Sequence, residues 1–365
     1  MSKTFLWRRF IWIILWVFLI SCTKEVVFGQ EVRDVDTVFV TGSKIYSDTL
    51  HISDSLVKLV KKYDNPVIKQ NAADPSVIRG ENGIFYLYST ESSTFPNIPI
   101  FKSIDLVNWY FVGTAFNDTT RPSSFEGNLW APDVNYIDGK YVLYYSMSVW
   151  GGEWDCGIGV AVADYPWGPF VEFAKLFDSR QIGVQNSIDP FYIEDQGERF
   201  LFWGSHHGIY GIQLADNGLS LKNGVEKFQI AGGGGEGTYI HIHDGKYYLF
   251  QSVGSCCNGL SSTYNIRVGV ADNLRGPYFD RQNKPMMESI GTLLLQGNAS
   301  VVGTGHNSEI ITDDDGVDWM LYHGYQRSDP SVGRVVYMDK ISWDGGWPYI
   351  EGYSASLSSE IPFFK

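Results

Sequence analysis

The chain has 365 residues, of which 44% are hydrophobic and 19% charged, so it can bury a core and is not a disordered tail. Its formal net charge of −13, without any Lys/Arg stripe, makes a partner with a phosphate backbone unfavourable, so nucleic acid is not expected. Aromatic residues make up 15%. Such rings either fill the space between packed sheets or stack on sugars, and a neutral polysaccharide fits this composition.

The N-terminus reads as a targeting segment. A basic start precedes residues 10–20, an apolar run too short to span a bilayer comfortably as a helix. The run ends in Leu19-Ile20-Ser21-Cys22, which resembles the bacterial lipoprotein box. We therefore expect a signal peptide over residues 1–21, lipidation of Cys22, and an exported protein that is lipid-anchored to the outer membrane or cell surface, or periplasmic. An uncleaved apolar anchor is the alternative.

Residues 22–62 are polar and poor in aromatics, which predicts a tether. From residue 63 to 365 short β-rich runs alternate with Gly, Asp and Asn, as in an all-β domain. The other three cysteines are Cys156, Cys256 and Cys257. Because their number is odd and adjacent cysteines rarely bridge, no disulfide framework is expected.

A turn followed by an aromatic-rich strand occurs five times. The copies are GIFYLYS from Gly83, GKYVLYYS from Gly139, GERFLFWGS from Gly197, GKYYLFQS from Gly245 and GVDWMLYH from Gly316. Five units, each with about four strand-like runs, predict an all-β, five-bladed β-propeller over residues 63–365. A β-sandwich is the alternative, but it would not explain a fivefold repeat.

One prominent polar residue lies upstream of each repeated strand. These residues are Asp74, Asp133, Asp189, Glu236 and His306. Because the first strand of each propeller blade lines the central channel, we expect these positions to converge at one mouth of that channel. A single Asp-Pro more often marks a turn. Three acids in register favour carboxylate chemistry, in which one acid protonates a leaving oxygen and another activates water or attacks.

The motifs resemble glycoside hydrolase family 43, particularly its arabinan endo-1,5-α-L-arabinosidase branch. The resemblance covers roughly residues 65–350 and is carried by AADPSVIR, NLWAPDV, NSIDP, GGGGEGTYI, CCNGLSSTYNIRVG and GTGHNSEI, in that order. It implies a five-bladed propeller and hydrolysis with inversion of configuration. Asp74 then matches the general base, Glu236 the general acid and Asp189 the carboxylate that tunes and orients that acid.

The resemblance also assigns residues to substrate and metal. Sugar contacts are expected from Trp130, Trp150, Asn186, Ser187, Ser205 and His206. His306 matches a channel histidine that contacts a calcium ion directly or through water, although no cofactor is required for the chemistry. One residue departs from the arabinanase pattern: Ala73 stands where a histidine usually precedes the catalytic Asp-Pro.

His241 and His243 stand two residues apart on one strand face and could hold a metal, but no third ligand is evident in the sequence. Solvent-facing or packed imidazoles are the alternative.

We therefore expect an inverting, monomeric glycosidase that cleaves α-L-arabinofuranosyl linkages in plant cell-wall arabinan or arabinoxylan, with membrane contact through the lipid anchor only. An exo-acting α-L-arabinofuranosidase or β-xylosidase of the same family is one alternative, and a non-catalytic surface glycan-binding lipoprotein is another. A pure binder has no reason to keep Asp74, Asp189 and Glu236 together.

Overall fold

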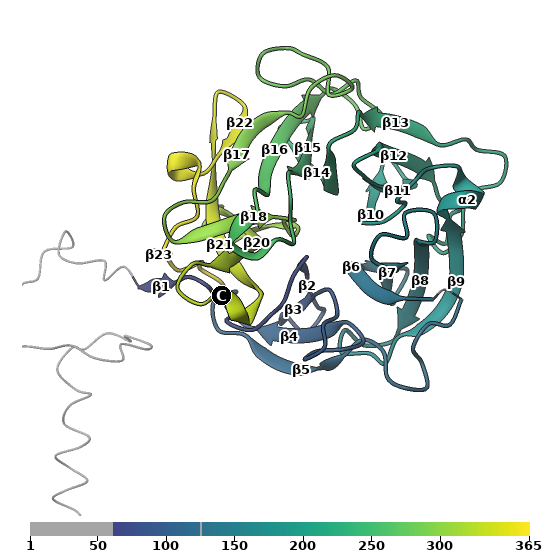
Figure 1. Ribbon diagram of the computed structural model, residues 1–365, viewed down its shortest axis with the longest axis horizontal. Coiled ribbons are helices and arrows are strands. Elements are labelled where there is room, and N and C mark those ends of the chain that lie inside the picture. The colour runs from purple at the N-terminus through teal and green to yellow at the C-terminus, as the bar shows by residue number, and fades with distance from the viewer. Residues whose placement is uncertain (1–60, 125) are drawn as a thin grey trace, which may run out of the picture. The chain divides into compact units, whose positions relative to one another are not determined.

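The computed structural model describes residues 61–124 and 126–365, and the predicted signal peptide, Cys22 and nearly all of the tether lie outside these residues. The described part of the chain contains five antiparallel sheets arranged as a ring (Figure 1). The predicted five-bladed β-propeller is thereby confirmed. No helix among the described residues is long and apolar enough to cross a membrane.

Each blade is a meander whose first strand lies nearest the ring axis (Figure 1). Blade 1 contains β2 (Ser76–Arg79), β3 (Phe85–Tyr88), β4 (Pro99–Ser103) and β5 (Tyr110–Thr114). Blade 2 contains β6 (Asn128–Ile137), β7 (Lys140–Ser148), β8 (Gly157–Ala163) and β9 (Val171–Asp178). Blade 3 contains β10 (Phe191–Asp195), β11 (Glu198–Ser205), β12 (Gly208–Gln213) and β13 (Phe228–Ala231).

The last two blades complete the ring. Blade 4 contains β14 (Gly235–His243), β15 (Lys246–Val253), β16 (Asn265–Ala271) and β17 (Thr292–Leu295). Blade 5 contains β18 (Val301–Gly305), β20 (Asp318–Gln326), β21 (Arg334–Asp344) and β22 (Trp347–Tyr349), and β19 (Ile310–Thr312) also pairs with β20. The short helices are α2 (Ser179–Ile182), η1 (Gly259–Ser261), η2 (Pro330–Val332) and η3 (Glu351–Tyr353).

The aromatic strands are buried on both faces, which explains much of the aromatic content. Successive side chains of a strand point to opposite faces, so each second strand packs against the blade on either side. In β3, Phe85 and Leu87 join a core cluster with blade 5, whereas Tyr86 and Tyr88 join a cluster with blade 2. The aromatic residues of the repeated motif therefore form the packing between neighbouring blades.

The ring is closed between blade 5 and the start of the described chain. Strand β1 (Lys62–Asp64) pairs with β23 (Ser358–Glu360), so both ends of the described chain meet there. The Asn65 side chain donates to the Met338 carbonyl at 2.8 Å and accepts from its N–H at 2.9 Å. We call this junction the seam.

Candidate active site

One residue in each blade adopts a left-handed backbone conformation at the same mouth of the channel. These residues are Asp74, Ala131, Asp189, Gly237 and His306, with φ between 42° and 62°. Non-glycine residues rarely adopt positive φ, and such residues gather at functional sites when the surrounding structure holds them. A Cβ at Gly237 would lie 3.1 Å from the His306 ring, a tight contact that the ring could relieve only by shifting.

The end of each aromatic strand holds the left-handed residue of the next blade. The backbone N–H of Asp189 donates to Ser146 Oγ at 2.8 Å, and that of His306 donates to Ser252 Oγ at 2.7 Å. Equivalent bonds join the N–H of Ala131 to Thr90 Oγ1 (2.8 Å) and that of Asp74 to His323 Nδ1 (3.1 Å). In four blades, a polar residue at or directly after the end of the repeat thus fixes the backbone at the mouth.

Blade 4 breaks this pattern in a way that serves the acid. Ser205 Oγ, at the end of the blade 3 strand, donates instead to the Glu236 carboxylate at 2.7 Å. The Gly237 N–H turns to Asp189 Oδ2 at 3.1 Å. The backbone of blade 4 therefore links Asp189 to Glu236.

The expected register of the polar residues is wrong in two blades. In blade 2 the residue equivalent to Asp74 is Ala131 and not Asp133. In blade 4 it is Gly237 and not Glu236. Register shifts between Trp130 and Asp133 and between Glu236 and Tyr239 interrupt the strand pairing there. Such irregularities re-aim side chains next to active sites. Asp133 consequently does not line the cleft, whereas Glu236 does.

The remaining acids meet in one cleft of about 650 Å³. Asp74, Asp189 and Glu236 are all buried, and all three line this cleft together with His306. The His306 Nδ1 atom stands 3.4 Å from Asp74 Oδ1 and 4.0 Å from Asp189 Oδ2. The structure thus brings together the three predicted carboxylates and the predicted channel histidine.

Asp74 is held as a carboxylate. Arg334 donates to its Oδ1 at 3.0 Å, and Thr90 Oγ1 donates to its Oδ2 at 2.5 Å. Burial alone would raise the pKa of Asp74, but Arg334 and the imidazoles of His306 and His323 outweigh it and hold the pKa well below its usual range. A carboxylate that keeps its charge can accept a proton from water.

Asp189 shows the opposite behaviour. Burial, and then the negative charges of Glu236 and Asp74, raise the pKa of Asp189 well above its ordinary value. A proton is therefore retained in the part of the cleft that holds Glu236. The Tyr264 hydroxyl donates to Glu236 Oε1 at 2.9 Å, opposite Ser205 on Oε2. Hydroxyls can donate or accept, so both contacts survive a change in protonation.

The predicted sugar contacts divide into two groups. Trp130, Trp150, Asn186 and His206 line the cleft, and Trp150 is 73% exposed. Ser205 and Ser187 are buried and absent from the lining.

Each of the two serines supports another side chain. Ser205 reaches Glu236, whereas Ser187 Oγ accepts from Trp203 Nε1 at 3.1 Å and donates to the Val184 carbonyl. The structure therefore places Ser187 behind the cleft wall.

Two adjacent cysteines form a disulfide in the wall of the cleft. Cys256 and Cys257 are bonded to each other and line the cleft, while Cys156 is free and buried. The expectation that these neighbours stay unbridged is wrong. They stand in the tight loop between β15 and β16, where Gly254 has a φ of 97° and Ser255 N–H donates to Thr263 Oγ1.

Two buried oxygen atoms belong to residues that directly follow the mouth positions of blades 4 and 5. Thr238 Oγ1 and Asn307 Oδ1 are buried without a hydrogen-bond partner. They follow Gly237 and His306 in the chain, and these two residues approach each other closely. Ca²⁺ takes carbonyl, hydroxyl and water oxygens, so this donor set is suitable for calcium held partly through water.

Sequence reasoning missed four residues that contact the acids. Arg334, His323 and Thr90 contact Asp74, and Tyr264 contacts Glu236. Tyr264 lies in the motif CCNGLSSTYNIRVG quoted above, where sequence reasoning could have found it. Arg334 begins strand β21 after a turn, and its sequence surroundings carry no signal.

Comparisons with known proteins agree with this geometry. The family profile described as "Glycosyl hydrolases family 43" matches residues 63–348. The extracellular exo-alpha-(1->5)-L-arabinofuranosidase ArbA of Cellvibrio japonicus is 33% identical, over 76% of this chain and 86% of the relative. The extracellular endo-alpha-(1->5)-L-arabinanase 1 of Bacillus subtilis is 31% identical, over 75% and 86%. The solved Cellvibrio cellulosa alpha-L-arabinanase complexed with arabinohexaose aligns with a TM-score of 0.69 and 31% identity, covering 79% of this chain and 99% of that one.

Proposed function

The chain belongs to glycosyl hydrolases family 43 and is a glycoside hydrolase, and from this premise we propose that it cleaves α-L-arabinofuranosyl linkages in arabinan with inversion of configuration. The observation that carries the proposal is the convergence of three buried acids, Asp74, Asp189 and Glu236, in one cleft. The lowered pKa of Asp74 suits the base, and the raised pKa of Asp189 suits a neighbour of the acid that differs from it in charge.

The reaction follows from these positions. Asp74 takes a proton from a water molecule while the water oxygen bonds to the anomeric carbon. The glycosidic C–O bond breaks, and Glu236 gives its proton to the leaving oxygen. Asp189 positions the Glu236 segment through the Gly237 N–H and keeps a proton nearby.

The substrate assignment is tested by product analysis. Linear arabinan, branched arabinan and arabinoxylan are digested with the purified chain, and the products are separated over time. We expect arabinose or arabino-oligosaccharides from linear arabinan. Release of pentoses from arabinoxylan but not from arabinan would contradict arabinan as the substrate and favour the arabinofuranosidase or β-xylosidase alternative.

An exo-acting arabinofuranosidase is the second candidate, favoured by the exo-acting relative named above. Trp130, Trp150, the cysteine pair and Tyr325 all line the cleft. The endo-acting relative of Bacillus subtilis favours endo action in turn. Oligosaccharides of mixed length in the first minutes of digestion support endo action, whereas arabinose alone supports exo action.

Calcium near His306 is part of the proposal and would stabilise the mouth of the channel. When bound, such an ion supplies positive charge that orients water and nearby carboxylates. His306, Thr238 and Asn307 would hold it, directly or through water. We expect calcium to raise the melting temperature of the wild type after EDTA treatment and to have less effect on His306→Ala.

We also propose export and lipid attachment at Cys22, with one copy of the chain as the working unit. Two relatives are named extracellular, which supports export. Acyl chains would provide the membrane attachment. Cys22→Ser is expected to release the protein from membranes or block its processing. Fractionation with membranes unchanged from wild type would instead favour an uncleaved apolar anchor.

A further inference from the structure

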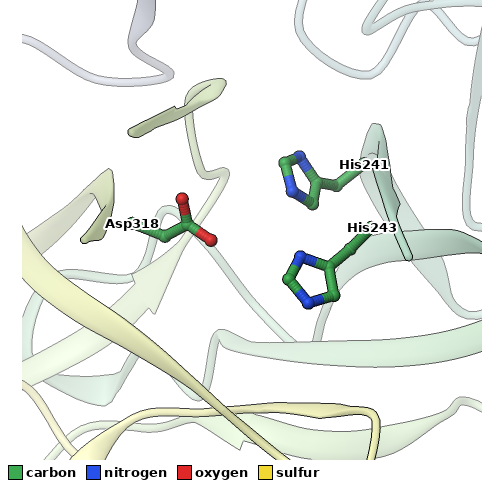
Figure 2. A group of neighbouring side chains, drawn as sticks. All are labelled: His241, His243 and Asp318. Carbon is green, nitrogen blue, oxygen red and sulfur yellow. The ribbon is translucent and has the colours of Figure 1, made fainter. Parts of the chain in front are cut away.

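Two imidazoles and a carboxylate converge at the end of β14 that is remote from the cleft. Glu236 is the second residue of β14, while His241 and His243 stand at its other end, roughly 20 Å away at about 3.3 Å per residue. Figure 2 shows both rings facing Asp318, the first residue of β20 in blade 5, and one ligand atom from each residue lies within 4.8 Å of the others.

We propose that His241, His243 and Asp318 form a binding site for a divalent transition-metal ion, Zn²⁺ in particular, which joins blades 4 and 5. Zinc takes imidazole nitrogen and carboxylate oxygen in tetrahedral sites, with three protein ligands and a water in open ones. The third ligand that the sequence did not reveal comes from the next blade. This site is independent of the proposed hydrolysis.

The surrounding groups hold the ligands as a metal site requires. A metal-bound imidazole usually donates its other ring N–H to an oxygen. The Tyr239 hydroxyl lies 3.1 Å from His241 Nδ1, which leaves Nε2 for the metal. Asp318 is buried and accepts one bond on each oxygen, from Thr312 Oγ1 at 2.6 Å and Trp343 Nε1 at 2.7 Å. A carboxylate has about four lone-pair positions, so capacity for a metal remains.

A modest side-chain adjustment completes the site. Zinc bonds of about 2.1 Å place tetrahedral ligand atoms roughly 3.4 Å apart, so atoms now up to 4.8 Å apart must close in. The His243 side chain is 26% exposed, so solvent reaches it to supply the fourth ligand. Asp244 Oδ2, 3.6 Å from His243 Nε2, is a second candidate for that position.

Packing is the competing explanation for the two rings. Trp343 stacks on His243 with ring centroids 3.6 Å apart and planes at 6°. Stacking alone would orient His243 without any metal. Packing alone predicts that the two histidines contribute nothing to zinc affinity, so a zinc titration distinguishes the two explanations.

The experiment uses the full chain in detergent, stripped with EDTA and then dialysed free of it. Zinc chloride is titrated by calorimetry into wild type, into the double variant His241→Asn/His243→Asn, and into two single variants that lack other imidazoles, His207→Asn and His306→Asn. The His306 variant removes cleft binding, and the exposed His207 controls for adventitious surface binding. We expect one zinc equivalent in wild type and both controls, with affinity at least about tenfold weaker in the double variant.

Thermal unfolding supplies a second readout. Zinc at about 100 times its dissociation constant should raise the melting temperature of wild type by roughly 5 °C and leave the double variant unchanged. If the double variant does not fold, His243→Asn alone gives the same comparison, because that ring is partly exposed. Equal zinc binding in wild type and variant, or no saturable binding in wild type, overturns the proposal.

Discussion

Two groups of carboxyls in the described part of the chain differ in their access to the cleft. Asp133 and Glu309 lie outside the cleft, and burial followed by the neighbouring charge raises the pKa of Asp133 well above its usual value. Their oxygens accept from Tyr192 N–H, Asn135 Nδ2, Ser76 Oγ and Val77 N–H. The acids at the mouth are buried as Asp133 is, yet they line the cleft. Burial and a perturbed pKa therefore do not identify a catalytic acid, whereas access to the cleft does.

The strongest test of this difference replaces acids in each group. Asp74→Asn and Glu236→Gln are each expected to lower kcat/KM on arabinan by about 10²–10⁴-fold, because each removes a positioned base or acid. The matched control Asp133→Asn should stay within a few-fold of wild type. Circular dichroism checks that all three fold.

An aryl arabinofuranoside separates the two roles, because a good leaving group needs little protonation. It should partly rescue Glu236→Gln but not Asp74→Asn. Near-normal hydrolysis of arabinan by either variant would remove that residue from the proposed chemistry.

A second test changes the charge that keeps Asp74 ionised. Burial raises the pKa of Asp74 and Arg334 lowers it, so Arg334→Gln leaves the raising effect less opposed. The pKa must then rise, and the acidic limb of kcat/KM moves to higher pH. We expect roughly a tenfold loss at pH 5 and a smaller loss at pH 7. The control is Arg327→Gln, which removes an arginine outside the cleft. An acidic limb that does not move would show that Arg334 does not set the charge of Asp74.

A third test concerns Asp189, which holds a proton beside Glu236. Asp189→Asn removes a group that can become negative in this part of the cleft. The proton needed for the leaving oxygen is then lost at lower pH, and the alkaline limb of kcat/KM moves down while the acidic limb moves less. Activity also falls, because the contact to the Gly237 N–H changes. An alkaline limb that stays in place or moves up would make Asp189 a structural or sugar-binding residue.

The smallest effect is expected from Asp133, which lies outside the cleft, and it is an effect on the melting temperature. An acid whose pKa is raised on folding binds more protons in the folded state, so stability falls as pH rises from about 4 through the folded pKa. Asp133→Asn keeps an oxygen acceptor and removes this loss. Between pH 5 and pH 8 the melting temperature of the variant should fall less than that of wild type, by roughly 2–4 °C. Parallel curves would mean that Asp133 does not titrate in this range.

The fold followed from the sequence because each blade repeats one strand that packs on both faces. The convergence of Asp74, Asp189, Glu236 and His306 followed from that repeat and from the family resemblance. The register at Asp133 and Glu236 did not follow, because a local shift in strand pairing carries no compositional mark. The same holds for contacts between distant segments. Arg334 reaches Asp74 across the ring closure, and a general rule against bonds between adjacent cysteines failed in one tight loop.

The seam between the two ends of the chain also bears on the reaction. Asp74 contacts Arg334, His306 and His323, and all three belong to blade 5 on the far side of the seam. The proposed base therefore connects blades 1 and 5 across the seam, whereas Glu236 lies in blade 4, away from the seam. If the seam separates on heating before any blade unfolds, Asp74 is displaced while Glu236 stays in place. Thermal inactivation should then run ahead of the loss of circular dichroism.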